Sequence, residues 1–155
     1  MSIDSRQVAA GLLDAVPFAR TLGIEVVEVA PEADGGVRAV VRLPDDPAHH
    51  NHVGGPHAGA MFTLGETASG AVVLAAFGQV LDRAVPLAVT ATIGYRKVAT
   101  GALLATARLG RPPADVLAEL DAGRRPEFGV DVEIGTEDGT VTSTLVVTWT
   151  LRPNR

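Results

Sequence analysis

The chain has 155 residues, of which 46% are hydrophobic and 20% are charged, and its net charge at pH 7 is −5. This length suits one domain with a substantial core, and we expect residues 1–155 to form a single domain. The apolar content argues against disorder, and the negative charge argues against a nucleic-acid partner, which usually binds a basic face. Because the chain has no cysteine, disulfides, thiolate metal sites and a cysteine nucleophile are excluded.

No segment is typical of a membrane span or a signal peptide. The longest nearly uncharged run, residues 58–81, is rich in Gly, Ala, Ser and Thr and contains Glu66. The first six residues, MSIDSR, lack a basic region followed by an apolar core. We therefore expect a cytoplasmic protein without a membrane partner.

The first elements are a helix and a hairpin. Residues 6–20 carry apolar side chains at helical spacing and predict a short amphipathic helix, with Ser5 as its cap and Pro17 disturbing its end. Strands are expected at 23–30 and 36–43, and the Asp-Gly-Gly sequence between them predicts a hairpin turn.

The middle of the chain predicts one long apolar helix, and the rest predicts strands. Residues 57–77 follow a loop rich in Pro, His, Asp and Gly and form the most apolar segment. An insert at 111–127 contains a short helical pattern that ends at Gly123. Four more strands are expected, at 86–98, 102–109, 128–136 and 141–151. Strands that follow one helix in a run predict an α+β fold, an antiparallel sheet wrapped around that helix.

Glu66 is the one ionisable residue between positions 58 and 81. A carboxylate on a buried helix is costly unless it is paired, hydrogen-bonded or protonated. It is either structural, reaching solvent or a basic partner, or a nucleophile or general base in a dry pocket. The Gly-rich turn before the helix, residues 51–59 (NHVGGPHAG), places backbone amides at a helix N-terminus, where they favour negative charge as an oxyanion hole requires.

This turn, followed by residues 61–67 (MFTLGET), resembles the hotdog-fold acyl-CoA thioesterases of the PaaI-like and 4-hydroxybenzoyl-CoA type. Their pattern is an amide residue, a histidine six positions later, and an acid nine positions after the histidine. Asn51, His57 and Glu66 match that spacing without a gap. The expected strand order also matches the hotdog fold over nearly the whole chain.

The resemblance implies an acyl-CoA substrate, no cofactor or metal, and a set of catalytic residues: Asn51, His57, Ala58, Gly59 and Glu66. Glu66 would attack the thioester carbonyl or activate water, and the amide of Ala58 would polarise the carbonyl oxygen. Asn51 would orient the substrate or the water, and His57 would shape the turn.

The chain departs from the family pattern at three places. Ala58 stands where the family has its first glycine, which keeps the N–H but adds a methyl group. Gly70 stands where some relatives carry a threonine that holds water, so water positioning falls to Thr67, Ser69 or Asn51. The insert at 111–127 is longer than the usual hairpin, although related hotdog proteins carry similar ones.

Helical geometry predicts that the site is shared between subunits. His57 and Glu66 lie about 13.5 Å apart along one helix axis and on opposite sides of it. Two antiparallel copies of the helix could each offer an N-terminus to the other's glutamate, so we expect a homodimer or a dimer of dimers. Arg96 and Lys97, at a strand end, would meet the CoA phosphates, unless they are an ordinary solvated strand end.

Three alternatives remain open. His49, His50, His52 and His57, with Asp45 and Asp46 before them, could form a metal site or a solvated loop, although no regular ligand spacing is present. A hotdog hydroxyacyl dehydratase or hydratase would use His52 and Glu66, which are fourteen residues apart, but the His-Phe-Pro-Gly run of those enzymes is missing. A non-catalytic acyl-CoA-binding protein would not need Glu66. The acyl group itself, aliphatic or small aryl, is not fixed by the sequence.

Overall fold

The computed structural model describes residues 3–155, so Met1 and Ser2, which belong to the segment inspected for a signal peptide, lie outside the described residues. The helices are α1 (Ser5–Ala15), α2 (Pro17–Thr21), α3 (Ala58–Phe77) and α4 (Pro113–Asp121), with 3-10 turns η1 (Pro47–His49) and η2 (Gly78–Val80). The strands are β1 (Glu25–Pro31), β2 (Val37–Leu43), β3 (Ala84–Tyr95), β4 (Leu103–Leu109), β5 (Glu127–Thr136) and β6 (Val141–Pro153).

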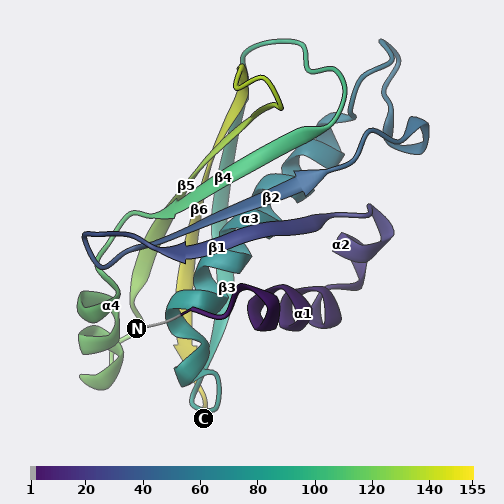
Figure 1. The fold of residues 1–155 in the computed structure, drawn as a ribbon. Coiled ribbons are helices and arrows are strands. Elements are labelled where there is room, and N and C mark those ends of the chain that lie inside the picture. Colours follow the sequence, from purple (N-terminus) through teal and green to yellow (C-terminus); the bar gives the residue numbers. More distant parts are fainter. Residues whose placement is uncertain (1–2) are drawn as a thin grey trace.

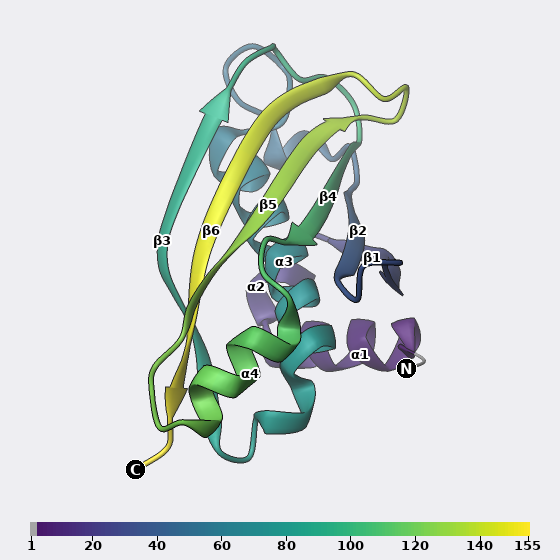
Figure 2. The ribbon, with the colours of Figure 1, turned by 90° about the vertical axis from the view of Figure 1, so that its left-hand side faces the viewer.

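The strands form one antiparallel sheet in the order β1-β2-β4-β5-β6-β3. The sheet curves around α3, and α1 lies across the lower part of that helix (Figure 1). Turned by 90°, the same arrangement shows β3 at one margin of the sheet and α4 at its lower end (Figure 2). The predicted α+β fold, an antiparallel sheet around one central helix, is confirmed.

The core lies between α3 and the concave face of the sheet. Leu64, Ala68 and Val72 of α3 have no exposed surface, and β2 alternates buried and half-buried residues as a sheet with one covered face should. The helix approaches the sheet so closely that a Cβ built on Gly65 would lie 2.6 Å from Leu145 Cδ2. Residues Ala58–Val80 are long and apolar enough to cross a membrane, but 72% of their most apolar window is buried inside the fold.

The N-terminal prediction needs correction. Instead of one helix over 6–20, two helices meet at Val16, because Pro17 has no N–H and begins α2. The cap of α1 is Asp4, whose carboxylate accepts from the amides of Arg6 (3.0 Å) and Gln7 (3.3 Å). Ser5, expected as the cap, uses its hydroxyl elsewhere, on the edge strand β1.

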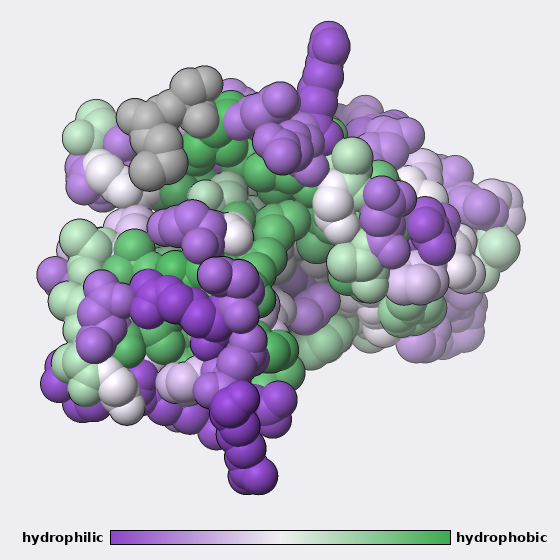
Figure 3. All heavy atoms as spheres, turned by 90° about the horizontal axis from the view of Figure 1, so that it is seen from below, coloured by the Kyte–Doolittle hydropathy of each residue, from purple (hydrophilic) through white to green (hydrophobic). Residues whose placement is uncertain are grey.

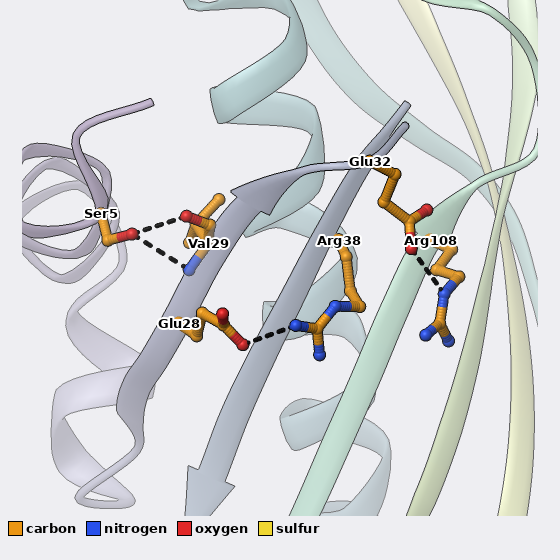
Figure 4. A network of polar contacts seen from close by, with 6 residues as sticks. All are labelled: Ser5, Glu28, Val29, Glu32, Arg38 and Arg108. Carbon is orange, nitrogen blue, oxygen red and sulfur yellow. Dashed lines mark hydrogen bonds and ion pairs between the residues drawn. The ribbon is translucent and has the colours of Figure 1, made fainter. Parts of the chain in front are cut away.

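The two edge strands of the sheet differ in whether another element covers them. At β1, the Ser5 hydroxyl donates to the carbonyl of Val29 (2.6 Å) and accepts from its amide (3.2 Å), so α1 blocks that edge (Figure 4). Ion pairs join Glu28 of β1 to Arg38 of β2 (2.7 Å) and Glu32, just after β1, to Arg108 of β4 (3.0 Å). At the other edge, residues 88–92 of β3 are all exposed, and no described strand pairs beyond it. An open edge of this length is a surface for strand pairing.

The insert forms the expected short helix. Val116 and Leu120 of α4 are buried, and the chain leaves the helix through Gly123, whose φ is +76°. Arg111 fixes the insert to the sheet, donating to the carbonyl of Glu127 (2.8 Å) and to the Glu119 carboxylate (2.6 Å). The hydrogen bond from Arg111 lowers the pKa of Glu119.

Candidate active site

Asn51 holds the turn that precedes α3. Its side-chain oxygen accepts from the amides of Val53 (3.0 Å) and Gly55 (3.2 Å), and its side-chain nitrogen donates to the carbonyl of Pro56 (3.3 Å). A Cβ on Gly55 would lie 2.3 Å from the carbonyl oxygen of Ala99, so this position has room only for glycine. The turn is therefore a compact unit pressed against the chain that follows β3.

His57 caps α3 next to the amide of Ala58. The ring Nδ1 of His57 accepts from the amide of Gly59 (2.8 Å), which requires Nδ1 to be unprotonated. Ala58 is the first helical residue, and within residues 3–155 no hydrogen bond uses its amide, while its carbonyl accepts from the hydroxyl of Tyr95 (3.1 Å). A free N–H at the start of a twenty-residue helix attracts negative charge.

A first hollow, which we name the turn hollow, opens at this helix start. It has a volume of about 350 Å³. The structure brings four of the predicted site residues together around it: Asn51, Ala58, Arg96 and Lys97. Arg96 is held over β6, since its Nε donates to the hydroxyl of Thr144 (3.2 Å), and both cationic residues are exposed. The turn hollow therefore combines a free amide with positive charge.

Glu66 lies in a second hollow, the acid hollow, of about 600 Å³. Within the described chain, no hydrogen bond or ion pair reaches the Glu66 carboxylate, which is half-buried, and burial raises its pKa. The rest of the lining is mainly aliphatic: Gly11, Leu12, Ala15, Val16, Thr67, Gly70, Val73, Leu74, Leu81, Ala84, Val85, Pro86 and Trp149.

The two hydroxyl residues after Glu66 differ in what they contact. Thr67 lines the acid hollow and is 2% exposed, and its hydroxyl oxygen has no hydrogen-bond partner among the described residues. Ser69 is fully buried, donating to the carbonyl of Glu66 (2.7 Å) and accepting from the indole N–H of Trp149 (3.1 Å). The hydroxyl of Ser69 thus ties the Glu66 turn of α3 to β6 and is not free for a substrate or a water.

Within one chain the two hollows are separate. They share no lining residue, and eight residues of helix place Ala58 and Glu66 about 12 Å apart along the axis. Of the predicted site residues, the structure thus groups Asn51, His57, Ala58 and Gly59 at the start of α3, and Glu66 with Thr67 in the acid hollow. One copy does not place an amide and the carboxylate around a single carbonyl carbon.

The histidine-rich loop is divided among different contacts. His50 lies 2.7 Å from the Asp45 carboxylate, and His52 is exposed. Nδ1 of His49 is buried and has no partner in the part of the chain that the structure describes. In residues 3–155 no three histidine or carboxylate side chains are grouped as metal ligands. His52 lines neither hollow, so it does not meet Glu66 within one chain as a dehydratase pair would.

Two aromatic residues that the sequence pattern did not point to also belong to these surfaces. Tyr95 binds the carbonyl of Ala58, and Trp149 lines the acid hollow. They are the one tyrosine and the one tryptophan of the chain. Their rarity in the sequence could have marked them as candidate site residues. Their contacts with α3 could not be predicted, because those contacts depend on the register of the strands.

Comparison with known proteins identifies the fold. The profile of a family described as a domain of unknown function (DUF4442) matches residues 4–151. No curated protein sequence matches the chain. A solved structure from Pseudomonas aeruginosa, described as a probable thioesterase of unknown function, is 25% identical, covers 99% of both chains and has a TM-score of 0.82.

Two further structures share the fold at lower identity. A thioesterase family protein from Silicibacter pomeroyi is 20% identical over 97% of this chain and 100% of its own, with a TM-score of 0.73. The Escherichia coli PaaI protein from the phenylacetic acid degradation operon is 19% identical over 96% of this chain and 92% of its own, with a TM-score of 0.70. The fold is the hotdog fold, and the resemblance to hotdog thioesterases of the PaaI type is confirmed.

Proposed function

The chain belongs to the DUF4442 family, and we propose that it hydrolyses the thioester bond of an acyl-CoA at a site shared by two copies of the chain. One observation carries the proposal: the half-buried carboxylate of Glu66 has no partner among the described residues and lies in a hollow whose lining is mainly aliphatic. A structural role would have given this carboxylate a basic partner or bulk water, because a buried unpaired charge is costly. The fold shared with proteins described as thioesterases supports the same conclusion.

The chemistry follows from a carboxylate and an amide on either side of one carbonyl carbon. Glu66 either attacks this carbon or takes a proton from a water that does so, and the carbonyl electron pair moves to oxygen. The amide of Ala58 stabilises that oxyanion. The C–S bond then breaks, and the thiolate leaves and takes up a proton. If Glu66 attacked directly, water then hydrolyses the mixed anhydride on its carboxylate, which releases the acid and restores Glu66; if Glu66 acted as a base, the attacking water has already supplied the oxygen of the free acid. We assign the positioning of the water to Thr67, whose buried hydroxyl has no partner among the described residues.

The open edge of β3 supports the shared site. The start of this strand, Ala84 to Pro86, lines the acid hollow, and its end, Tyr95, lines the turn hollow. If two copies pair their β3 edges antiparallel about a two-fold axis, the start of one strand lies beside the end of the other. The acid hollow of one copy then adjoins the turn hollow of its partner. A homodimer places Glu66 of one copy near Ala58 of the other.

The remaining residues of the turn hollow suit a CoA thioester. Arg96 and Lys97 offer positive charge for its phosphates. Asn51 and His57 keep the turn in shape, so that the amides of Ala58 and Gly59 stay at the helix start. The acid hollow accepts the acyl group. No observation favours the dehydratase or hydratase reaction or a purely acyl-CoA-binding role.

A panel of acyl-CoAs hydrolysed by the wild type and by Glu66→Gln tests the proposal. The variant keeps the size and polarity of the side chain but removes the base, so turnover should fall by about a hundredfold or more while acyl-CoA binding persists. Glu133→Gln is the matched control, since Glu133 is exposed on β5 and lines neither hollow. Near wild-type turnover by Glu66→Gln, or hydration of enoyl-CoAs without hydrolysis, would refute thioester hydrolysis by Glu66.

A further inference from the structure

The crossing of α1 over α3 is built from glycine on both helices. A Cβ on Gly11 would lie 3.7 Å from Leu74 Cδ2, and a Cβ on Gly70 would lie 3.7 Å from Leu12 Cδ1. Both are ordinary contact distances, so alanine would fit at either position. Glycine lowers helix stability relative to alanine, and packing therefore does not explain either residue. What the two positions share is that both line the acid hollow.

A further hollow borders the acid hollow at this crossing. This hollow, of about 480 Å³, which we name the far hollow, shares Gly11, Leu74 and Leu81 with the acid hollow. The far hollow ends among polar side chains, Asp4, Gln7 and Gln79. Seen from below, hydrophobic residues gather between hydrophilic ones at the end of the molecule where α1, α4 and the C-terminal end of α3 lie (Figure 3). The acid hollow, which contains Glu66, and the far hollow therefore lie side by side at the crossing of α1 and α3.

We propose that Gly11 and Gly70 determine acyl specificity, by keeping open a channel beneath α1 that takes a linear aliphatic acyl chain. The inference rests on the proposed thioester hydrolysis and names its substrate class. The lining of the acid hollow is aliphatic apart from Glu66, Thr67 and Trp149, and the indole N–H of Trp149 is already bound to Ser69. A compact aryl acyl group would end before the far hollow, whereas a linear chain can follow the channel beyond the crossing.

The channel makes hydrolysis dependent on chain length. Each methylene group buried in an apolar site contributes about fourfold to the apparent binding constant, so kcat/KM should rise with chain length until the channel is filled. A leucine at position 70 or 11 would occupy the space of about four carbon atoms in a close-packed interior. Its effect should fall on long acyl chains and spare short ones.

The experiment compares wild type, Gly70→Leu and Gly11→Leu on linear acyl-CoAs from butanoyl to hexadecanoyl and on phenylacetyl-CoA. We expect the wild type to prefer linear chains to the aryl substrate, and the best chain length to shorten by roughly two to four carbons in each variant. Gly70→Ala, with its Cβ at an ordinary contact distance, should fold and shift the optimum less. Gly129→Leu, a position on β5 with no atom within 4 Å of the new Cβ, should not shift it.

A binding measurement separates failure of the channel from failure of the reaction. Linear carboxylates of increasing length are titrated by calorimetry into Glu66→Gln, with and without Gly70→Leu. Affinity should rise with length in the first protein and level off earlier in the second. If the wild type hydrolyses no acyl-CoA, the proposed function fails, and this titration alone judges the channel. Folded variants with unchanged length profiles, or a more than tenfold preference for the aryl substrate, would overturn the inference.

Discussion

The N-terminal half of α3 and its middle differ in the kind of polar group that they leave unpaired. At its N-terminus, the polar side chains of Asn51 and His57 are bound to the turn itself, and the amide of Ala58 has no partner among the described residues. In its middle, the carboxylate of Glu66 has no partner within residues 3–155 and lies among mainly aliphatic side chains. The N-terminal half has an N–H group that can stabilise negative charge, and the middle has a carboxylate that carries it. This difference is the basis of the proposed shared site, in which a second chain supplies the group that the first lacks.

The largest effect is expected when the amide of Ala58 and the carboxylate of Glu66 are removed in two separate variants. Ala58→Pro removes the amide N–H but suits the first helical position, and His57 already has the extended conformation that proline requires before it. Loss of an oxyanion donor should reduce kcat by about 10²- to 10³-fold. Ala58→Thr, which adds bulk but keeps the N–H, is the control and should lose less.

Mixing the two inactive proteins then tests whether the halves come from different chains. In a heterodimer of Ala58→Pro and Glu66→Gln, one of the two shared sites has both groups intact. After random subunit exchange, about a quarter of wild-type activity should return, because half of the dimers are mixed and each has one good site. Activity that stays at the level of the separate variants would show that each chain uses its own Ala58 and Glu66.

A smaller effect should follow from loosening the turn. Asn51→Ala removes the acceptor for the amides of Val53 and Gly55 and the donor to Pro56. Leaving such groups unpaired should lower the free energy of unfolding by about 1–3 kcal/mol. Misplacement of the helix start should lower kcat/KM on the order of tenfold. Asn51→Asp keeps the acceptor and should lose less stability, as measured by urea unfolding. Equal stability of Asn51→Ala and wild type would contradict this role.

The sequence predicted the parts of the molecule that depend on periodicity. Residues 57–77 were recognisable as the central helix because their apolar character has no polar face, and α3 begins at Ala58 and ends at Phe77. The hairpins were recognisable from their glycine turns. The break at Val16 was not, because Pro17 at the end of one helix and at the start of the next gives the same local pattern.

The site was predictable only in part, for a physical reason. The spacing of Asn51, His57 and Glu66 identified the groups, but hydroxyl partners depend on side-chain direction. Ser69 looked available for water and instead bonds to Trp149, a residue 80 positions away. The contribution of α1 to the acid hollow likewise depends on how two helices cross, which no local pattern encodes. The assignment of roles to the site residues stays a prediction until the variants are measured.

The smallest effect concerns the cost of holding Glu66 where it is. Burial raises its pKa above the ordinary value, so the folded protein keeps a proton that the unfolded chain has already released. In the pH interval between the ordinary and the raised pKa, the folded state binds more protons, and stability falls as pH rises. Glu66→Gln lacks this penalty. Its melting temperature should therefore exceed that of the wild type above the raised pKa, by about 2–4 °C for each kcal/mol relieved. The difference should vanish below the ordinary pKa of a glutamate, where both proteins carry a neutral side chain.

The same titration requires kcat/KM of the wild type to rise with pH through the raised pKa, since a nucleophile or base must be ionised. A melting difference that does not depend on pH would mean that Glu66 is not desolvated, and the distinction between the two halves of α3 would lose its physical basis.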